Sequence, residues 1–99
     1  MKIIIVGLGQ IGSLLAQRIP MENHDATVID ADKEKIEDIT NLYNVNGICG
    51  SGASREILLK AGAATADIII SVSSVDEVNL MSCMIAKDCG TRYAMAKID

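Results

Sequence analysis

A glycine-rich segment near the start of the chain has the residue types and spacing of a phosphate-binding loop. Residues 7–12 read GLGQIG and fit the pattern G-x-G-x-x-G, directly after the β-branched run Ile3–Val6 and at the start of a helical pattern. In such a loop Gly7 permits a tight turn, Gly9 lets the backbone approach a pyrophosphate, and Gly12 lets the helix pack against the strand. The helix N-terminus supplies unpaired N–H groups and the positive end of a dipole. We therefore predict a nucleotide-phosphate site, with a ligand-free glycine turn as the alternative.

A carboxylate at the end of the second predicted strand complements this loop. Asp30 closes the run Ala26–Ile29, close to the separation of about 20 residues expected for an acid that binds ribose hydroxyls. No Lys or Arg occupies positions 31 or 32, so a 2′-phosphate would face Asp30 and Asp32 without a compensating charge. We therefore expect NAD(H) to bind in preference to NADP(H). A turn or helix cap is the alternative role for Asp30, and Asp32 is expected to cap the next helix.

A second small-residue loop follows the weak third strand predicted at residues 47–49. Cys49, Gly50 and Ser51 lie at the start of this loop, and Gly52 follows them. In a parallel sheet of this kind the third strand borders the adenine end of the crevice, so the loop is predicted to line an adenine pocket. A simple connector, with Ser54 capping the next helix, explains the same residues equally well.

Two serines follow the fourth predicted strand at residues 68–72. Ser73 and Ser74 would lie opposite the glycine loop, where their hydroxyls can reach phosphates or the second nucleoside of a dinucleotide. Ser74 and Glu77 also match a capping box, in which the serine caps a helix and the glutamate reaches back. That pattern explains Ser74 without a ligand, so both roles stay open.

Candidates for catalysis are scarce. His24 is the only histidine and is predicted in a surface turn away from the crevice, and Cys49 has no basic partner in the sequence to activate it. Cys83 and Cys89 fall within a helical pattern, where core packing is expected. Because no nucleophile–base pair or general acid emerges, we predict that the chain is not an enzyme. The alternative is the cofactor lobe of an NAD-dependent oxidoreductase whose substrate domain is missing.

The elements that must position these residues alternate strictly between strand and helix. Strands are predicted at residues 3–6, 26–30, 47–49, 68–72 and 93–98, and helices at residues 10–19, 33–43, 55–61 and 75–89. We expect Pro20 to end the first helix and Gly90 the last. Right-handed crossovers then give a single α/β domain, a doubly wound, Rossmann-like parallel sheet with strand order 3-2-1-4-5. The crevice is predicted at the strand C-termini, between strands 1 and 4.

Composition excludes several functional classes. The 99 residues suffice for one domain, and 49% of them are hydrophobic, enough to form a core. A net charge of −4 and only two aromatic residues argue against nucleic acid as a partner. No run approaches the ~20 apolar residues of a membrane span, so no direct membrane insertion is expected. Three cysteines without metal-type spacing argue against a disulfide scaffold or a zinc module and favour a cytoplasmic setting.

The last predicted helix is apolar almost all round. Leu80 and Met84 lie on one side of it, and the stripe expected to pack on the sheet consists of Val78, Met81, Ile85 and Cys89. The fifth strand is expected to be an open edge of the sheet. We therefore predict a homodimer, or pairing with another lobe, through this helix and strand. The alternative is that the long side chains simply fold down beside the sheet.

Taken in order, the motifs resemble those of a known family over essentially the whole chain. They are G-x-G-Q-I-G at residues 7–12, Asp30, G-x-G at residues 50–52, L-x-x-A-G-x-x-x-A-D at residues 58–67 and V-S-S-x-D-E-x-N at residues 72–79. The chain resembles the N-terminal nucleotide-binding lobe of potassium-conductance regulators, the RCK or KTN domain. The segments at residues 58–67 and 72–79 are far more specific than the glycine motif.

The resemblance implies binding of NAD(H), or of ATP or ADP in the same crevice, to regulate a membrane-embedded potassium channel or transporter from the cytoplasmic side. The nucleotide contacts it implies are Gly7, Leu8, Gly9, Gln10, Ile11, Asp30, Ser73, Ser74 and Lys97. Three positions depart from the family pattern: Ser51 replaces a common Asp, Ala53 a usual Ser or Thr, and Lys97 a common Arg, which alone can hold a phosphate bidentately. The resemblance also implies that the lobe, residues 1–99, is incomplete at its C-terminal end and pairs in a homo-oligomer or with another lobe.

Overall fold

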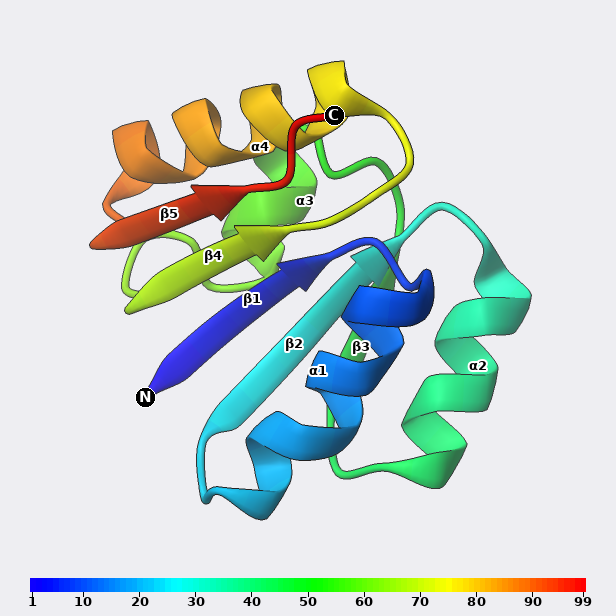
Figure 1. The fold of residues 1–99 in the computed structure, drawn as a ribbon. Coiled ribbons are helices and arrows are strands. Elements are labelled where there is room, and N and C mark those ends of the chain that lie inside the picture. Colours follow the sequence, from blue (N-terminus) through cyan, green and yellow to red (C-terminus); the bar gives the residue numbers. More distant parts are fainter.

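Five parallel strands form the centre of the structure, and four helices cover the two faces of the sheet (Figure 1). The computed structural model describes residues 1–99. The strands are β1 (Lys2–Val6), β2 (Asp25–Asp30), β3 (Asn46–Cys49), β4 (Ile68–Ser71) and β5 (Tyr93–Ala96). The helices are α1 (Gln10–Met21), α2 (Lys33–Leu42), α3 (Arg55–Lys60) and α4 (Asp76–Cys89).

The strand order is β3-β2-β1-β4-β5, which confirms the predicted doubly wound, Rossmann-like sheet. At the C-terminal end of β1, Val6 pairs with Ile29 of β2 on one side and with Ser71 of β4 on the other. The chain turns off the sheet in opposite directions after β1 and β4. The loops that follow these strands therefore diverge at this edge and leave a crevice between them.

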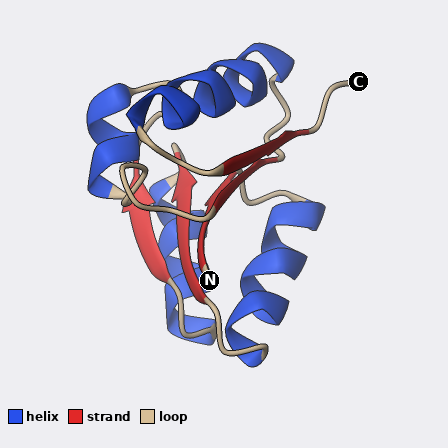
Figure 2. Cartoon of the chain, turned by 90° about the vertical axis from the view of Figure 1, so that its left-hand side faces the viewer, coloured by secondary structure: helices blue, strands red, loops and turns tan.

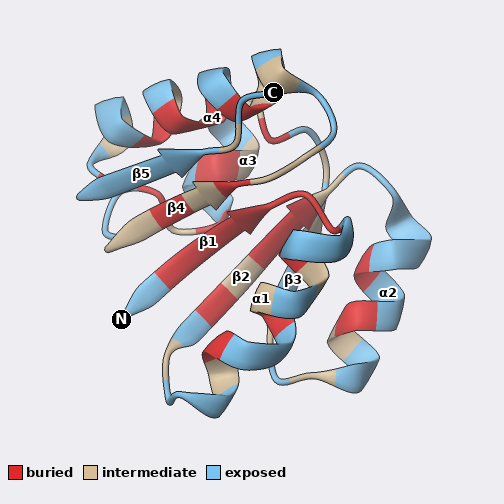
Figure 3. Cartoon of the chain, in the orientation of Figure 1, coloured by how far each residue is buried: buried red, intermediate tan, exposed pale blue.

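Each face of the sheet has its own hydrophobic core, and the central strands contribute to both (Figures 2 and 3). Ile3 and Ile5 pack with α1 and α2, whereas Ile4 and Val6 pack with α3 and α4. All four side chains are buried. Burial on both faces explains why β1 shows an uninterrupted β-branched run instead of polar alternation.

Two predicted boundaries are wrong by a few residues. Helix α1 continues through Pro20 to Met21. The proline costs the helix only one backbone hydrogen bond, and the amides of Glu22 and Asn23 donate to the carbonyls of Ile19 and Pro20 and so close the last turn. Strand β5 ends at Ala96 and not at residue 98. Its partner β4 ends at Ser71, opposite Ala96, so the sheet offers no further pairing beyond the bond from Lys97 N to Ser71 O.

The face that α4 presents to the sheet also differs from the prediction. Met81, placed by the prediction in the sheet-facing stripe with Val78, Ile85 and Cys89, is 45% exposed, and the other three are only partly buried. The buried residues of α4 are Asn79, Ser82, Cys83 and Ala86. Small and polar side chains let the helix approach β4 closely, where the hydroxyls of Ser82 and Ser71 share a buried hydrogen bond. Leu80 and Met84, predicted on another side of the helix from this stripe, are both more than half exposed.

Candidate functional site

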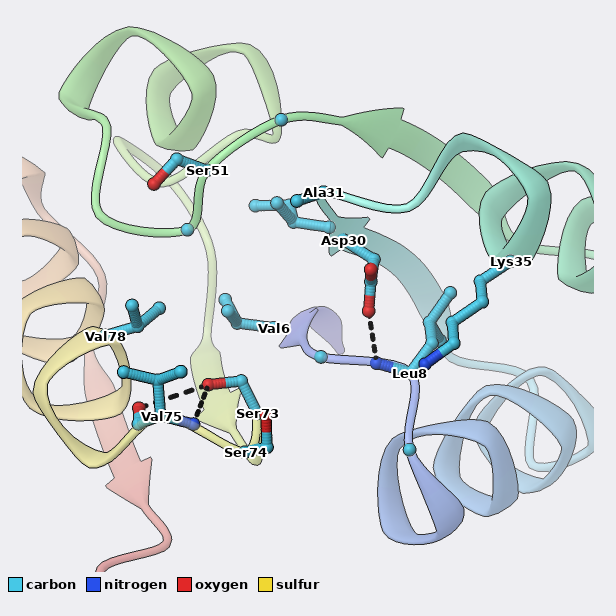
Figure 4. A pocket seen from close by; sticks show the side chains of 15 residues that line it. Val6, Leu8, Asp30, Ala31, Lys35, Ser51, Ser73, Ser74, Val75 and Val78 are labelled. Carbon is cyan, nitrogen blue, oxygen red and sulfur yellow. Dashed lines mark hydrogen bonds between the residues drawn. The ribbon is translucent and has the colours of Figure 1, made fainter.

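A cavity of about 320 Å³ opens at the C-terminal ends of β1, β2 and β4. Figure 4 shows its walls: the glycine loop and Asp30 on one side, and the loop after β4 on the other. The lining residues are Val6, Gly7, Leu8, Gly9, Ile29, Asp30, Ala31, Lys35, Gly50, Ser51, Gly52, Ser73, Ser74, Val75 and Val78. The cavity therefore lies where the sequence predicted a crevice, between strands 1 and 4.

Two of the three glycines of the first loop are required by the geometry of the fold, and the third is not. Gly7 has a φ of +99°, and a Cβ there would lie 2.6 Å from the Cα of Ser73. A Cβ on Gly12 would collide with the carbonyl oxygen of Gly7, so this glycine lets α1 pack against the loop. Around Gly9 a Cβ would meet nothing within 4 Å. The fold itself does not require a glycine at position 9, and its bare backbone borders open space.

The first turn of α1 carries unpaired amides. Gly9 caps the helix without a side-chain hydrogen bond, and the first bond into the helix runs from Ser13 N to Gly9 O at 3.0 Å. The amides of Gln10, Ile11 and Gly12 have no acceptor in the chain, and no carboxylate lies in this turn to compete for them. Gln10, Ile11 and Gly12 are not among the residues that line the cavity, so their amides lie at its border, next to Gly9. Unpaired backbone N–H groups at a helix start can hold an anion.

The carboxylate of Asp30 is hydrogen-bonded to the glycine loop. Its Oδ2 accepts a hydrogen bond from Leu8 N at 2.8 Å, and its Oδ1 accepts one from Asp32 N at 2.8 Å. Asp32 in turn caps α2 by accepting from Glu34 N, as predicted. A carboxylate has about four acceptor positions, so each oxygen of Asp30 keeps one for a further donor. The predicted turn role and the capacity to accept ribose hydroxyls therefore coexist in this residue.

Lys35 is a lining residue that the sequence analysis missed. It extends from the first turn of α2 toward Leu8, beside Asp30 (Figure 4). No carboxylate pairs with its ammonium group; the neighbouring Lys33 instead pairs with Glu37. Positions 31 and 32 hold no cation, but position 35, further along in the first turn of α2, does. A signal was available, because the Asp32 cap starts a helix whose first turn carries position 35 back toward the strand end.

The loop after β3 forms the far end of the cavity. Gly50, Ser51 and Gly52 line it, while Cys49 does not. The thiol of Cys49 lies 3.5 Å from the carbonyl oxygen of Ala31, a lining residue, but Cys49 itself is not part of the lining. Ser54 caps α3 by accepting from Ile57 N, as predicted.

The loop after β4 contradicts the predicted capping box. The N-cap of α4 is Val75, without a side-chain hydrogen bond, and Ser74 does not cap the helix. The hydroxyl of Ser73 instead donates to Asn79 Oδ1 at 2.7 Å and accepts from Val75 N at 3.3 Å. The side chain of Asn79, instead of Ser74, thus fixes the loop before α4 to the start of the helix. Ser74 is exposed, lines the cavity and keeps its hydroxyl unpaired.

Lys97, which the resemblance implied as a nucleotide contact, lies outside the cavity lining. Its ammonium group donates to Asp99 Oδ2 at 2.8 Å, and this hydrogen bond raises the pKa of Lys97 above its usual value. To contact a phosphate in the crevice, the side chain would have to leave Asp99.

The side chains considered for catalysis lie elsewhere. His24 bonds the N-terminal amine of Met1 at the opposite end of the sheet. Cys83 is buried in the core, and Cys89 accepts a hydrogen bond from Arg55 on the outer face. The ionisable side chains that line the cavity are Asp30 and Lys35. The chain has no cluster of three or more potential metal ligands, and none of its helices has the length and apolarity to cross a membrane.

The fold defines a class: a Rossmann-like, doubly wound α/β domain. Among solved structures, the NAD(P)-binding domain of an exopolyphosphatase-related protein from Archaeoglobus fulgidus has a TM-score of 0.80 at 18% identity, over 94% of this chain and 69% of that one. The GsuK channel bound to NAD has a TM-score of 0.78 at 21% identity, over 93% of this chain and 17% of that one. At these identities the likeness concerns the fold.

The sequence identifies the family within this class. The TrkA-N domain matches residues 3–99, and the chain belongs to this family. The Trk system potassium uptake protein TrkA of Halomonas elongata is 37% identical over 86 residues, which are 87% of this chain and 19% of that protein. The chain thus spans about a fifth of the length of this relative. The match confirms the predicted resemblance to this family.

Proposed function

We propose that this chain is a regulatory nucleotide-binding domain that binds NAD(H) in the cavity between β1 and β4 and controls a potassium channel or transporter. ATP or ADP can share the same crevice, because they carry the same adenosine and phosphate groups. The observation that supports this most is that an open glycine backbone and a ribose-type carboxylate line one cavity, with the unpaired amides of α1 directly after the glycine.

Each wall of the cavity has a part in this proposal. The amides of α1 and the bare backbone at Gly9 bind the pyrophosphate. Asp30 accepts the hydroxyls of the adenine ribose with its remaining acceptor positions. The small residues Gly50 and Ser51 leave room for the adenine base. Ser74, whose hydroxyl is unpaired, faces the second nucleoside.

The regulatory role and the partner come from the relatives. The relatives include the Trk system potassium uptake protein TrkA, and the GsuK channel, part of which has the same fold, is bound to NAD in its solved structure. By analogy we propose residues 1–99 as an RCK-type N-terminal lobe that acts on a membrane-embedded potassium transporter from the cytoplasmic side. In this role the ligand shifts a conformational equilibrium, and no chemical step is required.

Exposed apolar side chains of α4 and β5 support association with a second copy of this lobe. Leu80, Met81 and Met84 project from α4, whereas Tyr93 and Met95 project from β5 on the other face of the sheet, in register with Ile68 and Ile70. All five side chains are 45–59% exposed. Strand β5 also leaves its outer edge without a partner. Exposed apolar side chains that gather on neighbouring elements mark interaction sites in soluble proteins. We therefore propose a homo-oligomer built through α4 and the free edge of β5.

A calorimetric affinity panel tests the proposed ligand class. NADH, NAD, NADPH, ATP and ADP are titrated into the same preparation of the chain. We expect measurable binding of NADH or of an adenine nucleotide with a stoichiometry of about one per chain. Absence of binding for every member of the panel contradicts the proposed function.

A further inference from the structure

Asn79 is a fully buried amide that makes four hydrogen bonds, although it touches neither the cavity nor the surface. Its Oδ1 accepts from Ser73 N at 2.8 Å and from Ser73 Oγ at 2.7 Å. Its Nδ2 donates to Ser73 O at 3.0 Å and to Lys97 O at 2.9 Å. An asparagine side chain has two donor and two acceptor positions, and here all four are used.

These four bonds join two segments that are distant in sequence. Three go to Ser73, which forms the wall of the cavity after β4. The fourth goes to the carbonyl of Lys97, directly after the end of β5. Because buried hydrogen bonds in a protein interior are costly to break, the planar amide holds the two segments in one fixed relation.

The segment after β5 has few other attachments. Lys97 N bonds Ser71 O at 2.9 Å, and Asp99 N lies 3.4 Å from Asp76 Oδ1 at the start of α4. Figure 1 shows this segment leaving the sheet and running toward the first turn of α4. Asn79 is thus the one side chain that bonds both to the cavity wall and to the chain that leaves β5.

We propose that Asn79 is a positioning residue that transmits ligand occupancy at the Ser73–Ser74 wall to residues 97–99. This inference rests on the proposed nucleotide site. A ligand that contacts Ser74 restricts the loop at Ser73, and the amide of Asn79 passes this restriction to the Lys97 carbonyl. Coupling between two sites is reciprocal, so the order of residues 97–99 also affects the affinity for the ligand.

Backbone NMR of the full chain during NADH titration tests the coupling. Calorimetry on the same samples first establishes binding. In the wild type, we expect the amide signals of Ile98 and Asp99 to shift and to saturate with the calorimetric dissociation constant. Asn79→Asp keeps an oxygen toward Ser73 but turns another against the Lys97 carbonyl. This variant is expected to bind NADH roughly three- to tenfold more weakly and to show no shift of Ile98 and Asp99 at saturation.

Ser82→Ala is the matched control, because Ser82 is an equally buried polar residue of α4 that bonds Ser71 and not Lys97. It is expected to keep the shifts. Asn79→Ala, which introduces no buried charge, replaces Asn79→Asp if the latter fails to fold. Shifts that persist in an Asn79 variant, or are absent from a wild type that binds NADH, contradict the coupling and leave the proposed function intact. A wild type that binds no nucleotide contradicts both.

Discussion

The carboxylate of Asp30 and the backbone amide of Leu8 are joined by a hydrogen bond of 2.8 Å. This bond connects the end of β2 to the glycine loop after β1. The residue proposed to bind the ribose therefore also sets the position of the loop proposed to bind the phosphates. The two parts of the site form one unit, and a change in the acid acts on both.

Replacing Asp30 with alanine is expected to affect binding and stability together. Two backbone amides, those of Leu8 and Asp32, lose their acceptor, which lowers the free energy of unfolding by about 1–3 kcal/mol. Affinity for NADH falls by roughly tenfold or more, because the ribose loses its acceptor. Chemical denaturation and calorimetry measure the two effects. Asp32→Ala is the control: it removes a helix cap worth about 1 kcal/mol but leaves NADH affinity unchanged.

Lys35 is expected to moderate the preference for NADH over NADPH. The carboxylate of Asp30 disfavours a 2′-phosphate by on the order of 1–3 kcal/mol, and the nearby ammonium group of Lys35 offsets part of this. In Lys35→Ala, NADPH affinity falls by about two- to fivefold while NADH affinity stays constant. Lys33→Ala, which removes a cation that pairs with Glu37 instead, leaves the ratio unchanged. Wild-type binding of NADPH as tight as that of NADH would refute the assignment of Asp30.

The chain is expected not to oxidise bound NADH. The ionisable side chains at the cavity are Asp30, which is held by backbone amides, and Lys35 at the adenine-ribose end. No acid is placed to protonate a carbonyl substrate near the second nucleoside. Absorbance of the reduced nicotinamide, followed with simple aldehydes, ketones and keto acids, should stay constant. A loss of absorbance that scales with protein concentration would favour the oxidoreductase alternative.

Self-association is expected through α4 and β5. Leu80→Glu and Met84→Glu place charges on the exposed apolar side of α4 without touching the core, since both side chains are more than half exposed. Each variant should shift a dimeric wild type toward monomer in sedimentation across a dilution series. Leu42→Glu on α2, also more than half exposed but on a helix that packs on β2 and β3, away from β5, is the control and should leave the dimer intact. A wild type that stays monomeric at high concentration contradicts this prediction.

The arrangement of strands was predictable from sequence because β1 is apolar without alternation and glycine follows it. The face that α4 turns to the sheet was not predictable. Helical periodicity assigned long apolar residues such as Met81 to that face, whereas the helix packs on the sheet through Ser82 and Ala86. Close approach to β4 and the bond to Ser71 decide this, and both depend on tertiary contacts. The predicted capping box was wrong for a similar reason. The start of α4 is held by the hydrogen bond between Ser73 and Asn79, and not by a cap from Ser74.

Within the site, residues adjacent to strand ends were predictable, and residues brought in by other elements were not. Gly7, Asp30 and Ser73 follow directly from the rule that ligands bind at strand C-termini. Lys35 reaches the cavity from a helix, so its place depends on where α2 begins. Lys97 pairs with Asp99 and is kept away from the crevice, a contact between neighbours that the family pattern does not reveal.

Gly9→Ala tests the central claim most directly, because the fold leaves room for the added Cβ and only a ligand at the loop would meet it. The φ of Gly9, −75°, is open to alanine, so the free energy of unfolding should change by no more than about 1 kcal/mol. Calorimetric titration with NADH is predicted to show a loss of affinity of about tenfold or more, ~1.4 kcal/mol. Gln10→Ala, whose side chain lies outside the cavity, should bind like the wild type. A folded Gly9→Ala variant that binds NADH as tightly as the wild type would contradict the account.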